Sequence, residues 1–455
     1  MTAGDPGLEQ LTDTEIARVI ETQSNGRHED LRRCALGILN TGANVDNTKE
    51  ILGMYPDFDI EVEKSRQGVA FTLLNAPSDA FIEGTDDKPV LIESIREHIC
   101  AAVRDLVHQI NVIGRMETEE EITEAVFKIM RHAGFFDINA IRGCEKLDMN
   151  RIFAWGGHSI NDEEYKYSKD VGEQMALRLF EIITGCGPGA MRGPFSGSTR
   201  ANTKRRIVNA KMIGLTCPSI ITSEPPNEFV NPLIIMPDIE KRLEGFVRGS
   251  MGGIVFPGGV GTAEEIQMIL SILLHEKNNN VQYPLVFTGP RSAKSYFQSI
   301  DTFLMKTLGH EAIDGKYKIF IDDPKGVADY MKQYSKQARM WRDALNESYT
   351  WFGKLYLPPE VQHPFESNHE NVAKLNLHRD QSPYELAVQL RRLFSAIVAG
   401  NVTDAGIHMI QEKGSFEING DPEIIEALEE LLQRFVQEKR MKLEGDYKPC
   451  YMLKK

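Results

Sequence analysis

The segment with the clearest potential for chemistry is rich in glycine and lies between a short apolar run and a helical one. It reads Pro257-Gly258-Gly259-Val260-Gly261-Thr262-Ala263-Glu264-Glu265. Three glycines let the backbone turn tightly and expose its N–H groups, and the Thr262 hydroxyl adds a further donor. A helix N-terminus contributes partial positive charge, so such a segment can hold a phosphate without a lysine. The G-K-[ST] sequence of a Walker A loop is absent, which disfavours ATP hydrolysis.

The same segment also has a purely structural interpretation. Thr262-x-x-Glu265 has the spacing of a capping box, in which the glutamate only closes the first turn of a helix. Spacing alone leaves both interpretations open. The density of glycine directly after a predicted strand favours phosphate binding.

Two further glycine loops follow predicted strands. Gly185-Cys186-Gly187-Pro188-Gly189-Ala190 formally matches a dinucleotide fingerprint, but the acidic residue expected about 20 positions later is missing. We therefore favour a loop that closes over a single nucleotide through Gly187, Gly189 and Met191, with a simple tight turn as the alternative. In Gly156-Gly157-His158-Ser159, Gly157 and Ser159 are candidate contacts to sugar or phosphate, whereas a lone histidine such as His158 is more typical of a structural role.

One arginine upstream of the Pro-Gly-Gly segment could complete a site. Arg242 and Phe246 share a helix face by their i, i+4 spacing. A guanidinium suits bidentate binding of phosphate or polarisation of a leaving base. For an isolated helix, however, a solvated arginine is the default.

The elements that must position these residues alternate between strand and helix. The predicted strands are Ile152–Trp155, Ile182–Thr184, Met212–Thr216, Leu233–Met236, Gly253–Phe256, Leu285–Phe287 and Ile319–Ile321. The predicted helices between them include Glu163–Phe180, Ile239–Arg248 and Ala263–Leu274. This alternation predicts an α/β fold, a doubly wound parallel sheet with ligands beyond the carboxyl ends of its strands.

Chain length and rhythm indicate three sections. We expect a mixed α+β section at 1–145, the nucleotide-binding α/β core at 146–334, and a second mixed α+β section at 335–455. Pro358 to Asn376 is expected to be a loop, and Asp421-Pro422 is expected to begin a helix with the aspartate as its N-cap. Regulation is one purpose that the two outer sections could serve.

The composition is that of a globular protein with an acidic balance. Of the 455 residues 41% are hydrophobic and 26% charged, and the formal net charge is −14. This balance disfavours nucleic acid and acidic membranes as partners, so an anionic ligand requires a local site. Six scattered cysteines, no recognisable signal peptide and no apolar run of about 18 residues favour a cytoplasmic location, and the cysteine spacing disfavours zinc.

Two features together resemble the LOG ("Lonely Guy") phosphoribohydrolases. These are Arg242, fifteen residues before Pro257, and the P-G-G-x-G-T-x-x-E of Pro257–Glu265. The loop at Gly185–Met191 matches their earlier glycine-rich region loosely. The similarity covers about residues 150–330, and the three-part layout resembles the larger bacterial pyrimidine/purine nucleotide 5'-monophosphate nucleosidases. The first loop departs from the usual C-G-S-S, and Leu243 stands where a lysine usually follows the arginine.

The resemblance implies a Rossmann-like core without metal or cofactor that hydrolyses the N-glycosidic bond of purine and pyrimidine nucleoside 5'-monophosphates. The products would be free base and ribose 5-phosphate. Glu265 is the expected carboxylate beside an oxocarbenium-like sugar. Glu264 is the alternative, because neighbours on a helix differ by about 100°. Arg242 would orient the nucleotide or stabilise the departing base. The 5'-phosphate would be held by Pro257, Gly258, Gly259, Gly261 and Thr262.

Other interpretations remain open. A non-catalytic nucleotide-binding regulator would bind nucleotide without releasing base, whereas the missing ribose-binding acid counts against an NAD(P) oxidoreductase. No sequence feature indicates the Schiff-base lysine of a pyridoxal-phosphate decarboxylase. We also expect a homo-oligomer, dimer or tetramer. Four basic residues on one helical stretch are candidates for an anionic nucleotide effector, with a solvated helix as the alternative: Lys332, Lys336, Arg339 and Arg342.

Overall fold

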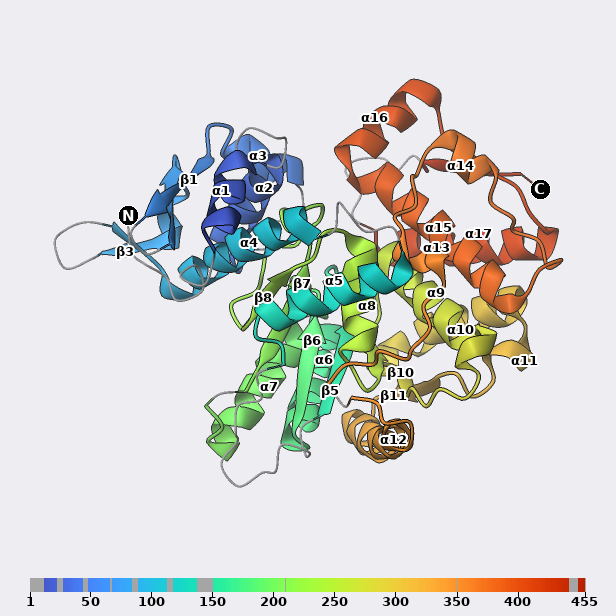
Figure 1. Ribbon diagram of the computed structural model, residues 1–455. Helices are drawn as coiled ribbons and strands as arrows, with labels where there is room; N and C mark the ends of the chain where they lie inside the picture. The colour runs from blue at the N-terminus through green and yellow to red at the C-terminus, as the bar shows by residue number, and fades with distance from the viewer. Residues whose placement is uncertain are drawn as a thin grey trace. The chain divides into compact units, whose positions relative to one another are not determined.

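The computed structural model (Figure 1) covers most of the chain. It describes residues 12–22, 28–43, 48–65, 68–83, 89–112, 118–136, 150–208, 210–348, 350–441 and 449–454. All candidate site residues fall within these segments. The chain divides into two compact units. Unit 1 comprises Met1–Asp148, Glu181–Pro188 and Ile207–Phe246, and unit 2 comprises Met149–Phe180, Gly189–Arg206 and Val247–Lys455.

A seven-stranded sheet has the strand order β11-β10-β9-β5-β6-β7-β8. Its strands are β5 (Asn150–Trp155), β6 (Phe180–Thr184), β7 (Met212–Thr216), β8 (Leu233–Ile235), β9 (Gly253–Val255), β10 (Leu285–Gly289) and β11 (Lys318–Ile321). The pairs β5–β9, β9–β10, β10–β11, β6–β7 and β7–β8 are parallel. Strands β6, β8, β9 and β10 are short runs buried along their length, as a parallel sheet covered by helices requires. The predicted α/β class with a Rossmann-like core is confirmed.

The strand order reverses at β5. After β5 the chain adds β6, β7 and β8 in turn, and it then returns to pair β9 with β5 on the other side. The register of this pair runs from Phe153↔Gly253 to Trp155↔Val255. In open α/β sheets, ligands bind beyond the carboxyl ends of the strands at such a switch point. Both strands belong to unit 2, so the loops that follow them can be described within one unit.

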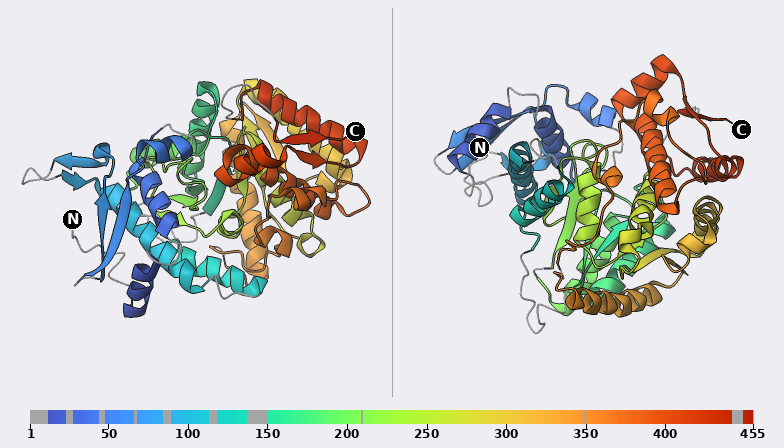
Figure 2. Two further views of the ribbon diagram at one scale, coloured as in Figure 1. Left: turned by 90° about the horizontal axis from the view of Figure 1, so that it is seen from above. Right: turned by 45° about the vertical axis from the view of Figure 1, so that its right-hand side comes forward.

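Unit 2 surrounds these strands with helices and carries the C-terminal part of the chain. Its helices are α6 (Asp162–Leu177), α7 (Arg192–Arg205), α9 (Val260–Leu274), α10 (Lys294–Leu308), α11 (His310–Ile313), α12 (Pro324–Ala344), α13 (Pro359–Gln362), α14 (His369–Ala373), α15 (Pro383–Val402), α16 (Asp404–Lys413) and α17 (Pro422–Gln437). Strands β12 (Phe416–Ile418) and β13 (Tyr451–Leu453) pair in parallel. Helix α15 packs against α9 and α17 packs against α10, which is visible in both views of Figure 2 as red and orange helices beside yellow ones.

Unit 1 contains the N-terminal helices and two small antiparallel sheets. Its helices are α1 (Asp13–Thr22), α2 (His28–Leu39), α3 (Thr48–Met54), α4 (Glu93–Val112) and α5 (Glu119–His132), together with α8 (Ile239–Arg248) up to Phe246. The antiparallel pairs are β1 (Asp59–Ser65) with β2 (Gly68–Leu74), and β3 (Phe81–Glu83) with β4 (Pro89–Leu91). Helix α4 is fastened to β8 because Asp105 Oδ2 accepts from the Ile235 N–H at 2.9 Å and Gln109 Nε2 donates to the Ile235 carbonyl at 2.6 Å.

The predicted elements are confirmed, with differences at their ends. Helix α6 ends at Leu177, three residues before the predicted Phe180, because Leu179 adopts a φ of 68° that a helix cannot continue through. The expected loop at 358–376 contains the short helices α13 and α14. Asp421 is the N-cap residue of α17 as predicted, but its carboxylate makes no capping bond and accepts instead from His378 and from the Arg379 N–H. The three-section division stays a prediction. Within the described residues, no single helix is long and apolar enough to cross a membrane.

Candidate active site

The Pro-Gly-Gly segment forms the connection from β9 to α9. Helix α9 begins at Val260 with Gly259 as its N-cap, and its first backbone bond joins Ala263 N to Gly259 O at 3.1 Å. The N–H groups of the first helical turn therefore have no acceptor within the helix, and the positive end of the helix dipole lies beside them. Thr262 lies inside this turn instead of at the N-cap, so the capping-box interpretation is wrong.

The glycines of this segment differ in what surrounds them. A Cβ on Gly258 would lie 2.1 Å from Thr262 Oγ1, and one on Gly259 would lie 2.3 Å from the Arg440 carbonyl oxygen. Neither glycine has a left-handed backbone conformation. Both positions therefore require glycine because neighbouring atoms lie where a Cβ would be. A Cβ on Gly261 would meet no atom within 4 Å. Gly261 therefore faces open space beside the N–H groups of the first turn of α9.

Three predicted loops meet in unit 2. The Gly157 N–H donates to the Pro257 carbonyl at 3.0 Å, and the Ala190 N–H donates to the Gly157 carbonyl at 3.0 Å. Gly189 has a φ of +65°, and a Cβ there would lie 2.3 Å from the His158 carbonyl oxygen. The Ser159 hydroxyl is buried and has no hydrogen-bond partner among the described residues. The sequence placed these loops after strands, and their convergence at the switch point follows from the sheet topology.

The two neighbouring glutamates of α9 have different surroundings. Glu264 is buried, and its Oε1 lies 3.5 Å from the NH2 group of Arg391, a fully buried side chain of α15. Glu265 is half-buried and one helical step, about 100°, away from that pair. The geometry gives Glu264 a role in joining α9 to α15 and leaves Glu265 as the stronger candidate for contact with a ligand.

The remaining predicted loop residues belong to unit 1. Cys186 has a φ of 74°, and Asn227 Nδ2 donates to the carbonyls of Cys186 and Gly187 at 2.6 and 3.1 Å. Three residues after Asn227, the Val230 carbonyl accepts a hydrogen bond from His98 Nε2 at 3.1 Å. This bond helps to hold the segment that carries Asn227. Asn227 was not predicted, although an asparagine after Pro225-Pro226 is a turn signal. Met191, by contrast, lies in unit 2 as the buried N-cap of α7.

Arg242 is the candidate arginine of α8, also in unit 1. Its side chain is buried, its Nε donates to the Leu215 carbonyl at 2.9 Å, and its guanidinium carbon lies 5.4 Å from the centre of the Phe246 ring. The predicted shared face of these two residues is confirmed. Burial raises the pKa of the Cys217 thiol to about 11, an effect that the charge of Arg242 opposes. Cys217 is therefore a neutral thiol and not a nucleophile at neutral pH.

Two residues near the Pro-Gly-Gly segment escaped the sequence analysis. The Gly258 N–H donates to the hydroxyl of Tyr296 at 3.1 Å, and the Arg440 guanidinium carbon lies 4.5 Å from the centre of the Tyr296 ring. Burial raises the pKa of Tyr296 to about 12, so the hydroxyl stays protonated. No local pattern marks either residue, because they reach the segment from α10 and from the end of α17.

The basic stretch on α12 does not form the predicted anion-binding face. Arg342 is fully buried and its NH2 group donates to the Ser250 carbonyl at 2.9 Å, while Arg339 donates to Asn150 Oδ1. Lys332 and Lys336 are exposed. Since a fully buried guanidinium cannot meet a ligand in solvent, the prediction is wrong for Arg342. Within the part of the chain that the structure describes, no three His, Cys, Asp or Glu side chains are grouped to hold a metal ion.

Comparison with known family models gives matches in three parts of the chain. The models are those of pyrimidine/purine nucleotide 5'-monophosphate nucleosidases at residues 3–113, possible lysine decarboxylase at 197–331, and the C-terminal part of pyrimidine/purine nucleotide monophosphate nucleosidase at 335–454. The second includes Arg242 and the Pro-Gly-Gly segment.

Full-length relatives agree with these matches. The pyrimidine/purine nucleotide 5'-monophosphate nucleosidases of Escherichia coli strain K12 and strain O157:H7 are each 42% identical over 453 residues, 98% of this chain and 97% of theirs. A Rossmann-like parallel sheet with glycine-rich loops at its switch point is typical of nucleotide-binding α/β proteins. Within that class, the chain belongs to the pyrimidine/purine nucleotide 5'-monophosphate nucleosidase family.

Proposed function

We propose that this protein is an enzyme that hydrolyses the N-glycosidic bond of purine and pyrimidine nucleoside 5'-monophosphates. Water supplies a hydroxyl to C1' and a proton to the base, and the C1'–N bond breaks, so the products are ribose 5-phosphate and free base. The observation that carries the proposal is 42% identity over 98% of the chain to enzymes of this name.

The phosphate is held at the start of α9. The amides of Gly259, Gly261 and Thr262 are the proposed donors, because the Gly258 N–H is already taken by Tyr296 in this structure. The open space beside Gly261 supports this placement. Phosphate binding is remote from the bond that breaks, so its free energy can hold C1' in position for reaction.

Glu265 is the proposed catalytic carboxylate. It would stabilise positive charge at C1' and the 2'-hydroxyl as the base departs and would accept the proton of the attacking water. The ion pair of Glu264 with Arg391 supports this choice over Glu264. For Arg242 we propose orientation of the nucleotide or stabilisation of the departing base, and for Gly157, Ser159, Gly187, Gly189 and Met191 contacts to the nucleotide.

The test is incubation of the purified protein with AMP, GMP, CMP, UMP and adenosine, followed by chromatography for free base. Base from the monophosphates but not from adenosine is expected, since adenosine lacks the phosphate that α9 binds. Binding of nucleotide without release of base would overturn the proposal in favour of a nucleotide-binding regulator.

We further propose a cytoplasmic homo-oligomer, dimer or tetramer, that responds to an anionic effector. Among the described cysteines, five are buried and free of disulfides, which suits a reducing compartment. Light scattering of the purified protein measures the oligomeric state. Kinetics that change from sigmoidal to hyperbolic on loss of the effector would support regulation.

A further inference from the structure

A tight turn at the end of α17 places Arg440 next to the Pro-Gly-Gly segment. Lys439 has a φ of 54° and donates its N–H to the Val436 carbonyl at 3.0 Å, and the Arg440 N–H donates to the Phe435 carbonyl at 2.8 Å. These two bonds are those of a Schellman motif, which defines how the chain leaves a helix. The position of Arg440 is therefore set by its own backbone.

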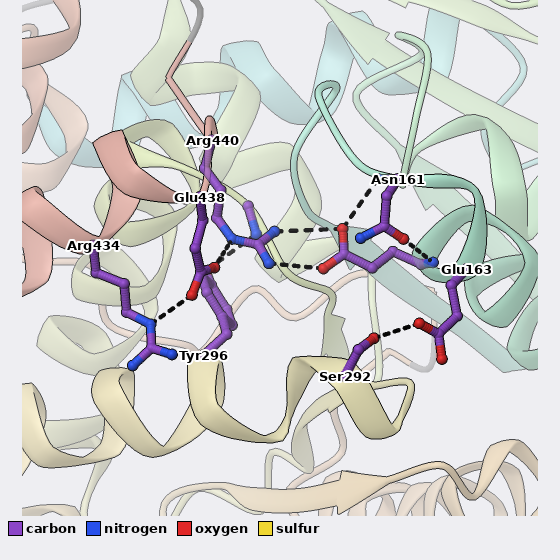
Figure 3. Close-up of polar contacts among 9 residues, drawn as sticks. Asn161, Glu163, Ser292, Tyr296, Arg434, Glu438 and Arg440 are labelled. Carbon is purple, nitrogen blue, oxygen red and sulfur yellow. Dashed lines mark hydrogen bonds and ion pairs between the residues drawn. The ribbon is translucent and has the colours of Figure 1, made fainter.

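The side chain of Arg440 lies in a charged network (Figure 3), with 9% of its surface exposed. Its guanidinium donates to both oxygens of Glu164, at 2.8 and 3.4 Å, and its Nε donates to Glu438 at 2.5 Å. Glu438 also accepts from Arg434 Nε at 2.6 Å. Burial acts to lower the pKa of Arg440, but the bonds to Glu164 and Glu438 outweigh it and raise the pKa, so the guanidinium stays charged.

This network connects two of the three loops that meet at the switch point. Glu164 accepts from the Asn161 N–H at 3.2 Å in the capping box of α6 and thereby restrains the end of the loop after β5. Tyr296, beneath the Arg440 guanidinium, accepts from the Gly258 N–H in the loop after β9. The Arg440 carbonyl itself lies against Gly259. One residue from the C-terminal part of the chain thus contacts or restrains both loops.

We propose that Arg440 is a positioning residue for the 5'-phosphate, which holds the loops after β5 and β9 at the spacing that presents the α9 amides to the ligand. The proposal rests on the phosphate placement given under the proposed function. The Arg440 guanidinium points at Glu164 and Glu438, so Arg440 acts on the two loops through these side chains and Tyr296, and not by contact with the ligand. Because Arg440 acts on the loops that hold the phosphate and contacts no reacting atom, its loss is expected to raise KM more than it lowers kcat.

The test compares Arg440→Gln and Arg440→Lys with the wild type and with Arg342→Gln, which removes another buried guanidinium of unit 2 away from these loops. The readouts are KM and kcat for AMP, and the dissociation constant of ribose 5-phosphate by calorimetry. Arg440→Gln is expected to raise KM and the dissociation constant at least about tenfold, with kcat within about threefold, since charged hydrogen bonds of this kind are lost. Arg440→Lys is expected to recover part of the loss, and Arg342→Gln to leave both constants unchanged.

A second variant covers the case in which Arg440→Gln does not fold. Tyr296→Phe removes only the hydroxyl that accepts from Gly258, and it is expected to raise the ribose 5-phosphate dissociation constant by about two- to fivefold. Unchanged ribose 5-phosphate binding in either folded variant, or an equal loss in Arg342→Gln, overturns the proposal. If the wild type releases no base yet binds ribose 5-phosphate with this dependence on Arg440, the proposed hydrolysis fails while the positioning role stands.

Discussion

The two longer glycine loops of the core use glycine for different physical reasons. In the loop after β6, Cys186 and Gly189 have φ values of 74° and +65°, so the chain needs a left-handed backbone to turn there. In the loop after β9, Gly258 and Gly259 lack that conformation and admit close neighbours, while Gly261 borders open space. Glycine therefore permits a tight turn in one loop, and close packing next to an open surface in the other.

The largest effect is expected from replacing the two neighbouring glutamates that follow the β9 loop, because one is proposed to act in catalysis and the other in packing. Glu265→Gln is expected to lower kcat by about 10²- to 10⁴-fold, the contribution typical of a positioned acid or base. Glu264→Gln, which loses the charge paired with Arg391, is expected to lower the free energy of unfolding while keeping kcat within about threefold. Steady-state kinetics and urea unfolding of both variants measure this. Wild-type turnover in Glu265→Gln would remove Glu265 from the mechanism.

The comparison of the loops is tested most directly by adding one methyl group to each. Gly189→Ala is expected to lower the free energy of unfolding by about 2–5 kcal/mol, because the left-handed backbone and the His158 carbonyl both oppose a Cβ. Gly261→Ala is expected to leave stability unchanged and to raise KM for AMP about tenfold, since the methyl group would enter the space proposed for the phosphate. Equal loss of stability in both variants would show that the loops do not differ.

Acidic pH is expected to destabilise the contact between His98 and Val230, which helps to hold the loop after β6. No such effect is expected for the loop after β9. Burial lowers the pKa of His98 from 6.5 to about 4, against the opposing bond to the Val230 carbonyl. Between pH 6.5 and pH 4, His98 is therefore protonated in the unfolded chain and neutral in the folded protein. The free energy of unfolding should be highest above pH 6.5 and fall by about 3 kcal/mol as pH drops to 4.

Urea unfolding at pH 7 and at pH 4.5 measures this loss, with His98→Gln as the control because an amide can still donate to Val230. Hydrogen exchange at 185–188 should rise before exchange at 257–262. A pH dependence that is the same in His98→Gln as in the wild type would contradict the assignment.

The smallest effect concerns the side chain that holds the β6 loop. Asn227→Ala removes the donor shared by the Cys186 and Gly187 carbonyls and is expected to lower the free energy of unfolding by about 1–3 kcal/mol, the penalty for buried acceptors left unsatisfied. Thermal unfolding measures the change. A value near zero would mean that the strained turn at Cys186 is held by the backbone alone.

The sequence by itself determined the sheet and the family. Apolar runs of three to five residues marked the strands, and the glycine segments after them marked the edge at which the loops meet, because both signals are local to the chain. Element ends were less certain: α9 begins at Val260 since Gly259 caps it, and α6 stops where Leu179 turns left-handed. The Pro257–Glu265 motif with Arg242 was sufficient for the family resemblance.

Only the tertiary structure decided which side chains surround that motif. The pairs Glu264–Arg391, Gly258–Tyr296 and Glu164–Arg440 join residues that lie 127, 38 and 276 positions apart. Hydrophobic periodicity and turn signals report on neighbours along the chain, whereas these contacts depend on how helices α10, α15 and α17 pack against the core. For the same reason, the four basic residues of α12 looked alike in sequence until burial separated Arg342 from the exposed lysines.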